Sequence, residues 1–177
     1  MTNETNLHTA ILAAIAAGKE IMAIYSTDFD VEEKSDNSPL TIADKNANDV
    51  INTFLEKLDI PIISEENKQI PYEIRKHWSR CWIVDPLDGT KEFVKRNGEF
   101  TVNIALIENG VPILGVIYVP VTKTLYYTAA DTTKALRSVV VEEDNITIEK
   151  ILDTSEEIKP TTNSTVALRV VGSRSHL

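Results

Sequence analysis

Two acidic residues surround a proline in the stretch Val84–Phe93, which reads V-D-P-L-D-G-T-K-E-F. Asp85 and Asp88 are three positions apart, and Gly-Thr follows at once. Pro, Gly and Asp together are typical of a structural turn. Hard divalent cations, however, prefer carboxylate and carbonyl oxygens as ligands. The proline would fix a tight loop in which both carboxylates and the Leu87 carbonyl converge, so the stretch also fits a cation site.

Two other segments offer carboxylates at the ends of expected elements. Asp44 is expected in the first turn of a helix, and Glu65-Glu66 follow a short buried strand, Ile60–Ile63. Taken singly, these residues are explained by a helix cap and a solvated pair. Together with Asp85 they predict one cation-binding site, because loops at element ends build sites. Zinc is disfavoured, since the histidines lack metal-ligand spacing: His8, His77 and His176.

A phosphate site is expected beside these carboxylates. Thr90 and Lys91 would open a helix directly after Gly89. The free amide groups and the positive end of a helix suit a phosphate group. A cation site next to a phosphate cradle predicts phosphoryl chemistry.

Hydrophobic periodicity predicts two helices before these motifs. Apolar residues recur at helical spacing over residues 7–26. A second stripe runs to Leu58 behind the capping-box pattern Thr41-Ile42-Ala43-Asp44. Both stripes are expected to be core.

The following segments predict a sheet that is at least partly antiparallel. A short strand, Cys81–Val84, runs into Asp85, and Phe100–Ile107 and Val111–Val119 are joined through Asn109-Gly110, a strong hairpin signal. Leu125–Thr128 adds a strand, Ala129–Thr165 is interpreted as a connection, and Val166–Val171 is expected to be a strand.

Composition narrows the class of protein. The chain has 177 residues and a formal net charge of −9, which argues against a nucleic-acid polymer as partner. The single cysteine, Cys81, excludes an intrachain disulfide and is expected to be a small buried residue in a reducing compartment. The apolar run Ala10–Ala17 is too short to span a bilayer, so no transmembrane segment is expected. A cytoplasmic protein is the expectation, with a peripheral position at the inner face of a membrane left open.

These residues resemble a known family. The sequence resembles the inositol monophosphatase superfamily of magnesium-dependent, lithium-sensitive phosphomonoesterases at three places in chain order: Asp44, Ser64-Glu65-Glu66 and Trp82–Thr90. Lys91–Leu106 and Ser173–His176 are similar to its CysQ branch, the 3′(2′),5′-bisphosphate nucleotidases.

The resemblance implies an α+β fold, a layered helix and sheet sandwich of the sugar-phosphatase type. Residues 1–177 would form its amino-terminal domain, with a helix pair and a largely antiparallel sheet. The family's later Trp-Asp-x-Ala-x-Gly segment has no match, because Trp78 and Trp82 are followed by Ser79 and Ile83. The carboxyl-terminal domain is therefore expected to be absent, which would expose an apolar sheet face and leave a homodimer open.

The resemblance also implies roles for single residues. Two or three Mg²⁺ ions would be held by Glu65, Asp85, the Leu87 carbonyl and Asp88. Catalysis would involve Asp44 and Thr90, which order the attacking water, with Glu65 close by. Contacts to the substrate would come from Glu65, Leu87, Asp88, Gly89, Thr90, Ser173 and His176.

The implied reaction is hydrolysis of the 3′-phosphate of adenosine 3′,5′-bisphosphate to AMP and phosphate, by in-line attack of a metal-bound water, in sulfate assimilation. Lithium would inhibit it. Three alternatives stay open: a truncated, non-catalytic domain that binds metal and phosphate, an inositol monophosphatase, and a phosphatase that forms an aspartyl-phosphate. The last usually carries Asp-x-Asp, in which alternation points both carboxylates at one site. Two residues intervene between Asp85 and Asp88, so the spacing disfavours this alternative.

Overall fold

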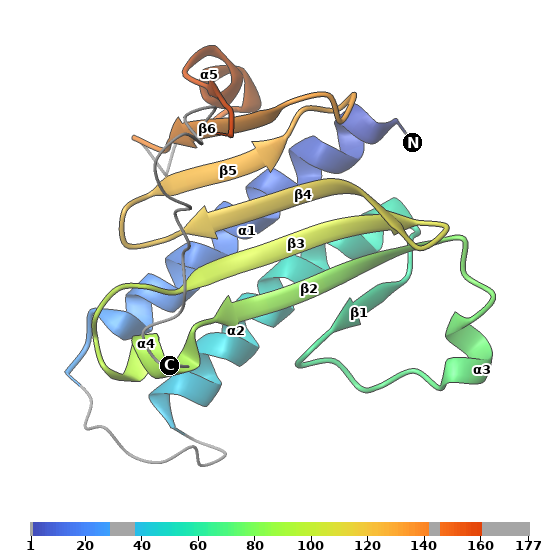
Figure 1. Ribbon diagram of the computed structural model, residues 1–177. Coiled ribbons are helices and arrows are strands. Elements are labelled where there is room, and N and C mark those ends of the chain that lie inside the picture. Colours follow the sequence, from blue (N-terminus) through green and yellow to red (C-terminus); the bar gives the residue numbers. More distant parts are fainter. Residues whose placement is uncertain (1, 29–37, 142–145, 161–177) are drawn as a thin grey trace, which may run out of the picture.

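The computed structural model describes residues 2–28, 38–141 and 146–160. A seven-stranded sheet with strand order β1 to β7 is covered on one face by two long helices, α1 and α2, that lie side by side (Figure 1). The predicted α+β architecture, a helix pair on a largely antiparallel sheet, is confirmed. In chain order the elements are α1 (Asn3–Tyr25), α2 (Pro39–Leu55), the 3-10 turn η1 (Glu56–Leu58), β1 (Ile62–Ser64), α3 (Tyr72–Arg75), β2 (Arg80–Asp88), α4 (Thr90–Val94), β3 (Thr101–Glu108), β4 (Val111–Val119), β5 (Thr124–Thr128), β6 (Ala135–Val139), α5 (Ile148–Asp153) and β7 (Glu156–Ile158).

Helix α1 begins four residues earlier than its apolar stripe predicts. The hydroxyl of Thr2 accepts a hydrogen bond from the amide of Thr5 and so caps the helix. By length and composition α1 would also be long enough to cross a membrane, which the short run Ala10–Ala17 did not indicate. One face of α1 is nevertheless buried against α2, β3 and β4, which is how a core helix packs.

Helix α2 also begins earlier than expected. Its cap is Ser38, whose hydroxyl accepts from the amide of Thr41, and Pro39 occupies the first helical position, where its missing N–H costs nothing. The expected cap at Thr41 was therefore wrong. As a consequence Asp44 lies in the second turn of α2 rather than in the first, and it is buried.

The sheet combines one parallel pair with antiparallel neighbours. Strands β1 and β2 are parallel, and every later pair is antiparallel. The predicted hairpin is confirmed, with Asn109 and Gly110 at φ 51° and 80° between β3 and β4. Alternate side chains of the central strands point into the core beneath the helices, as strand geometry requires: Trp82, Val84, Val102, Ile104, Leu106, Leu114, Val116 and Tyr118.

The opposite face of the sheet carries exposed apolar side chains. Ile83 on β2 and Ile117 on β4 are each almost half exposed. This agrees with the expected apolar face. Cys81 lies near the start of β2, as expected, but it is only half-buried. Burial raises the pKa of its thiol, which therefore stays protonated at neutral pH.

The segment Ala129–Thr165 was wrongly interpreted as a connection. It contains β6, α5 and β7, which extend the sheet by two strands. Hydrogen bonds tie the end of α5 to the sheet, between the hydroxyls of Tyr127 and Ser155 at 2.6 Å and between those of Ser138 and Thr154 at 2.8 Å. These contacts join residues far apart in sequence, so local periodicity does not reveal them. The expected strand Val166–Val171 lies outside the described residues.

Close packing of α1 on β4 at Gly18 leads to a prediction. A Cβ at Gly18 would lie 2.5 Å from the fully buried ring of Tyr118, whereas one at Gly115 in β4 would meet nothing within 4 Å. We expect Gly18→Ala to lower the free energy of unfolding by about 1–3 kcal/mol through overpacking, although alanine is the better helix former. Urea unfolding measures this.

Gly115→Ala is the matched control for that measurement. It should change the free energy of unfolding by less than about 1 kcal/mol, because the added methyl group has space. Equal stability of the Gly18→Ala variant and the unaltered protein would contradict the packing argument.

Candidate active site

A bulge in β2 brings Asp85 and Asp88 to one face of the sheet. Asp85 pairs with Asn103 and Asp88 with Thr101, so β2 uses one residue more than β3 over the same distance. Strict alternation would point these two aspartates to opposite faces, and the extra residue restores a common side. Pro86 lies within the bulge, where a missing ladder donor is tolerated. The predicted convergence of the two aspartates is therefore supported by the register.

The same bulge weakens one argument against an aspartyl-phosphate mechanism. Aspartyl-phosphate enzymes usually carry Asp-x-Asp, and the two residues between Asp85 and Asp88 counted against that class because strict alternation would separate the side chains. Because the bulge brings them to one face, their spacing does not separate the two classes of phosphatase. Similarity to known proteins, reported below, distinguishes a metal-dependent phosphatase from one that forms an aspartyl-phosphate.

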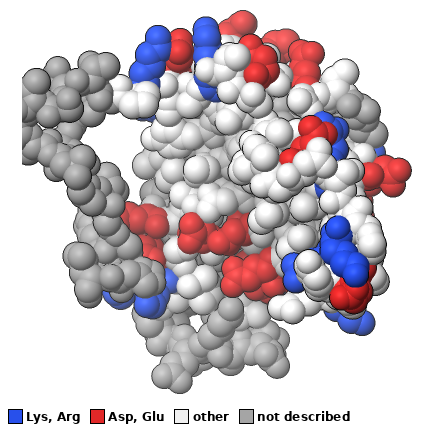
Figure 2. Space-filling view, turned by 45° about the vertical axis from the view of Figure 1, so that its right-hand side comes forward, with Lys and Arg blue, Asp and Glu red and all other residues white. Residues whose placement is uncertain are grey.

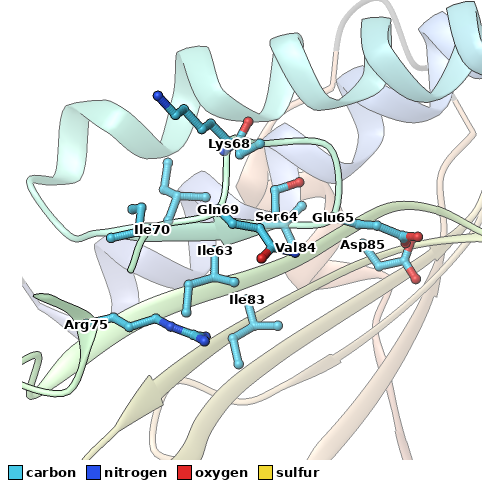
Figure 3. Close-up of a pocket in the computed structure, with 12 residues that line it drawn as sticks. Ile63, Ser64, Glu65, Lys68, Gln69, Ile70, Arg75, Ile83, Val84 and Asp85 are labelled. Carbon is cyan, nitrogen blue, oxygen red and sulfur yellow. The ribbon is translucent and has the colours of Figure 1, made fainter. Parts of the chain in front are cut away.

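Glu65 joins Asp85 through the parallel pairing of β1 with β2. Ser64 is in register with Val84, so the next residues, Glu65 and Asp85, are neighbours. The amide of Glu65 donates to the Val84 carbonyl at 3.4 Å. Figure 3 shows the carboxylates of Glu65 and Asp85 side by side, pointing the same way.

The electrostatics of Asp85 reflect this crowding. Partial burial raises its pKa, and the negative charges of Asp88 and Glu65 raise it further, to about 6. A backbone hydrogen bond from Leu87 lowers it, as in an Asx turn, and Glu66 adds a small increase. Like charges held this close are a site for a counter-cation, and an all-oxygen donor set suits a hard one.

Asn103 is a polar neighbour of these carboxylates that the sequence analysis missed. Its side-chain amide donates to Asp88 at 3.0 Å, and its oxygen accepts from the Thr101 hydroxyl at 3.1 Å. An asparagine within a β-rich run was the available signal. Within the described ranges no three Asp, Glu, His or Cys side chains lie close enough to enclose a metal ion, and mutual repulsion opposes a closer approach.

Gly89 and Thr90 stand where the bulge passes into α4, so the predicted helix start is confirmed. Gly89 has φ 95°, and a Cβ there would lie 2.9 Å from the Glu99 carbonyl oxygen. Only glycine fits both demands. The short helix is fixed from behind by Phe93, whose ring packs against Phe100 and Tyr25 at centroid distances of 5.4 and 5.3 Å.

The remaining predicted site residues lie on α2, within the bulge or outside the described residues. Asp44 lies on the buried face of α2, which contacts both β2 and α4. Leu87 is buried within the bulge. The predicted substrate contacts Ser173 and His176 lie outside the described residues.

An open hollow of about 430 Å³ lies beside the carboxylates (Figure 3). Glu65 and Asp85 line it together with Arg75 and an apolar floor that includes Ile63 and Ile83. Its volume is within the range of small-molecule sites. Acidic side chains also gather across the middle of the face shown in Figure 2.

Comparisons with known proteins place the chain in a family. The model of the inositol monophosphatase family matches residues 2–174, so the protein belongs to this family. The 3′(2′),5′-bisphosphate nucleotidase CysQ of Salmonella typhimurium is 56% identical over 117 residues, which cover 64% of this chain and 47% of that protein. CysQ of Haemophilus influenzae is 39% identical over 131 residues, 73% of this chain and 49% of that protein. The chain thus spans about half the length of the curated relatives it matches.

Comparison with solved structures supports the same family membership. The crystal structure of CysQ from Bacteroides thetaiotaomicron, a bacterial member of the inositol monophosphatase family, matches with a TM-score of 0.83 and 46% identity, over 97% of this chain and 64% of that one. Inositol monophosphatase from Anabaena matches with a TM-score of 0.58 and 30% identity, over 76% of this chain and 45% of that one. The chain is more similar to the CysQ structure than to this inositol monophosphatase.

The raised pKa of Asp85 predicts how stability depends on pH. Folding raises this pKa from its ordinary value of 3.8 to about 6. Asp85 therefore contributes stability that is fully present below pH 3.8 and is lost as the pH rises through about 6. In chelator-treated protein, Asp85→Asn should remove this decline, which urea unfolding at a series of pH values measures.

Asp131→Asn is the control, because Asp131 is exposed in the turn between β5 and β6. It should leave the decline between about pH 4 and 6 in place. Identical pH profiles for the Asp85→Asn variant and the unaltered protein would show that burial and the neighbouring carboxylates do not raise the pKa of Asp85.

Proposed function

We propose that this protein acts in a magnesium-dependent, lithium-sensitive phosphomonoesterase that hydrolyses the 3′-phosphate of adenosine 3′,5′-bisphosphate to AMP and phosphate. The observation that carries the proposal is the grouping of Glu65, Asp85 and Asp88 at one sheet face in a member of this family. Similarity to CysQ proteins supports the nucleotide substrate. Residues 1–177 would form the amino-terminal α+β domain of such an enzyme.

The proposed cation ligands are Glu65, Asp85, the Leu87 carbonyl and Asp88. Their oxygen-only chemistry and the raised pKa of Asp85 fit Mg²⁺, which would relieve the repulsion among the carboxylates. Bound Mg²⁺ would supply positive charge against phosphoryl oxygens and acidify water. This local charge matters in a protein of net charge −9, which by itself repels an anionic substrate.

The remaining groups would orient the reactants. Asp44 and Thr90 would hold and orient the attacking water, with Thr90 presented at the start of α4 by the turn at Gly89. The amides of Gly89 and Thr90 would bind the substrate phosphate, and Ser173 and His176 would contact the nucleotide. No covalent phosphoenzyme is required, because water attacks in line with the leaving 3′-oxygen.

A role in sulfur metabolism and a cytoplasmic location follow from the same proposal. The partner is a small nucleotide bisphosphate, and a homodimer through the exposed sheet face is consistent with Ile83 and Ile117. One observation favours a second function. Because the chain spans about half the length of its curated relatives, residues 1–177 alone could bind metal and phosphate without turning substrate over.

Phosphate release from adenosine 3′,5′-bisphosphate, with Mg²⁺ and with or without Li⁺, tests the proposal. We expect lithium-sensitive release, and we expect Asp85→Asn to lower it at least about 100-fold, since even outer partners of a metal are worth 10–100-fold. Asp131→Asn, which removes an exposed charge elsewhere, should retain the rate. Inositol monophosphate serves as the comparison substrate and should be hydrolysed more slowly.

Each other outcome has a definite meaning. Magnesium binding that Asp85→Asn weakens, without phosphate release, would favour the non-catalytic binding domain. Faster release from inositol monophosphate would correct the substrate, and a phosphate trapped on Asp85 would favour the aspartyl-phosphate mechanism. If the protein neither binds magnesium nor releases phosphate, the proposal is contradicted.

A further inference from the structure

Four polar side chains connect α2 with the turn that follows β1, and we call them the asparagine clamp: Asn48, Asn52, Ser64 and Asn67. The side-chain amides of Asn48 and Asn52 donate to the same Asn67 oxygen, at 2.9 and 3.0 Å. Asn67 donates back to the Asn52 oxygen at 3.3 Å. The Ser64 hydroxyl donates to the Asn48 oxygen at 2.6 Å. The three asparagines each donate and accept a hydrogen bond within this network, and Ser64 donates to it.

The turn held by this clamp carries the acidic pair Glu65-Glu66. The amide of Asn67 donates to the Ser64 carbonyl at 3.3 Å and closes the turn around the two glutamates. The amide of Glu65 donates to Val84 of β2. Glu65 is thus fixed to the sheet on one side and, through the clamp, to α2 on the other.

Burial of the clamp indicates a positional role. Asn48 and Ser64 are only 4% and 8% exposed, and buried polar groups cost desolvation that apolar side chains would avoid. A buried network whose polar groups are hydrogen-bonded holds its members in one defined geometry, here the turn after β1 against α2. Asn48 and Asn52 also continue, at intervals of four residues, the row of α2 that begins with buried Asp44. One helix row therefore includes a proposed water-orienting residue and two residues of the clamp.

We propose that the asparagine clamp positions Glu65 beside Asp85 for cation binding, an inference that rests on the proposed function. The clamp residues are positioning residues, because they act through the backbone of the turn and not on substrate. Without them, Glu65 would still follow β1, but its turn would lose the side-chain hydrogen bonds that join it to α2. Affinity for the cation would then fall, since Glu65 would have to be ordered on binding.

The test compares Asn67→Ala with Ile51→Val. The first removes three side-chain hydrogen bonds. The second trims a fully buried core residue of α2 and leaves the clamp intact. Titration calorimetry with MgCl₂ should show at least about tenfold weaker binding for Asn67→Ala. Hydrogen exchange of the Glu65 amide in chelator-treated protein should accelerate, relative to the Trp82 amide that donates to Pro61.

For Ile51→Val, both readouts should stay within about twofold of the unaltered protein. This should hold even if its thermal stability falls as much as that of Asn67→Ala. Ser64→Ala, a milder variant that removes one clamp bond, should move both readouts in the same direction by less. Equal effects of Asn67→Ala and Ile51→Val would overturn the proposal. So would unchanged exchange at Glu65 in Asn67→Ala.

The two proposals fail separately. If the unaltered protein binds no Mg²⁺ while Asn67→Ala still releases the Glu65 amide, the clamp holds the turn but the proposed magnesium function is wrong. If Mg²⁺ binds equally to both proteins, the function stands and the clamp proposal is wrong.

Discussion

The geometry of the candidate site depends on one extra residue in β2 between Asp85 and Asp88. A strand without the bulge would point one of these carboxylates into the apolar core, where an unpaired charge is very costly. With the bulge, the register against Asn103 and Thr101 places both on the same face, and Gly89 starts α4 directly behind them. The parallel pairing with β1 then sets Glu65 next to Asp85. Backbone hydrogen bonding thus brings three carboxylates to the same region of one sheet face, against their own repulsion.

Helix α2 serves the core and the site with different rows of one buried face. Apolar residues such as Ala47, Ile51 and Leu55 pack in the core. Asp44 and Asn48 lie among them and are also buried. The cost of burying polar groups is offset where they are bonded, as Asn48 is to Ser64 and Asn67. The face that anchors the helix thus also supports the turn carrying Glu65.

The family relationship and the geometry carry different parts of the functional argument. Membership in the inositol monophosphatase family comes from a match over residues 2–174, and the geometry explains how carboxylates converge at one sheet face. Similarity to CysQ proteins bears on the substrate, which the local arrangement of carboxylates does not specify. The helix pair and the sheet would be the same for a nucleotide or an inositol phosphate.

The sequence by itself determined the helix pair, the hairpin at Asn109-Gly110 and the acidic motifs, because these depend on local periodicity, turn chemistry and residue type. It missed β6, α5 and β7, and it placed the start of α2 at the wrong residue. Only the tertiary structure decided that Asp85 and Asp88 share a face and that Asn103 and Asn67 support the acidic residues. Strand register and contacts between distant residues are set by pairing partners, and a local pattern carries no record of which partner a strand will find.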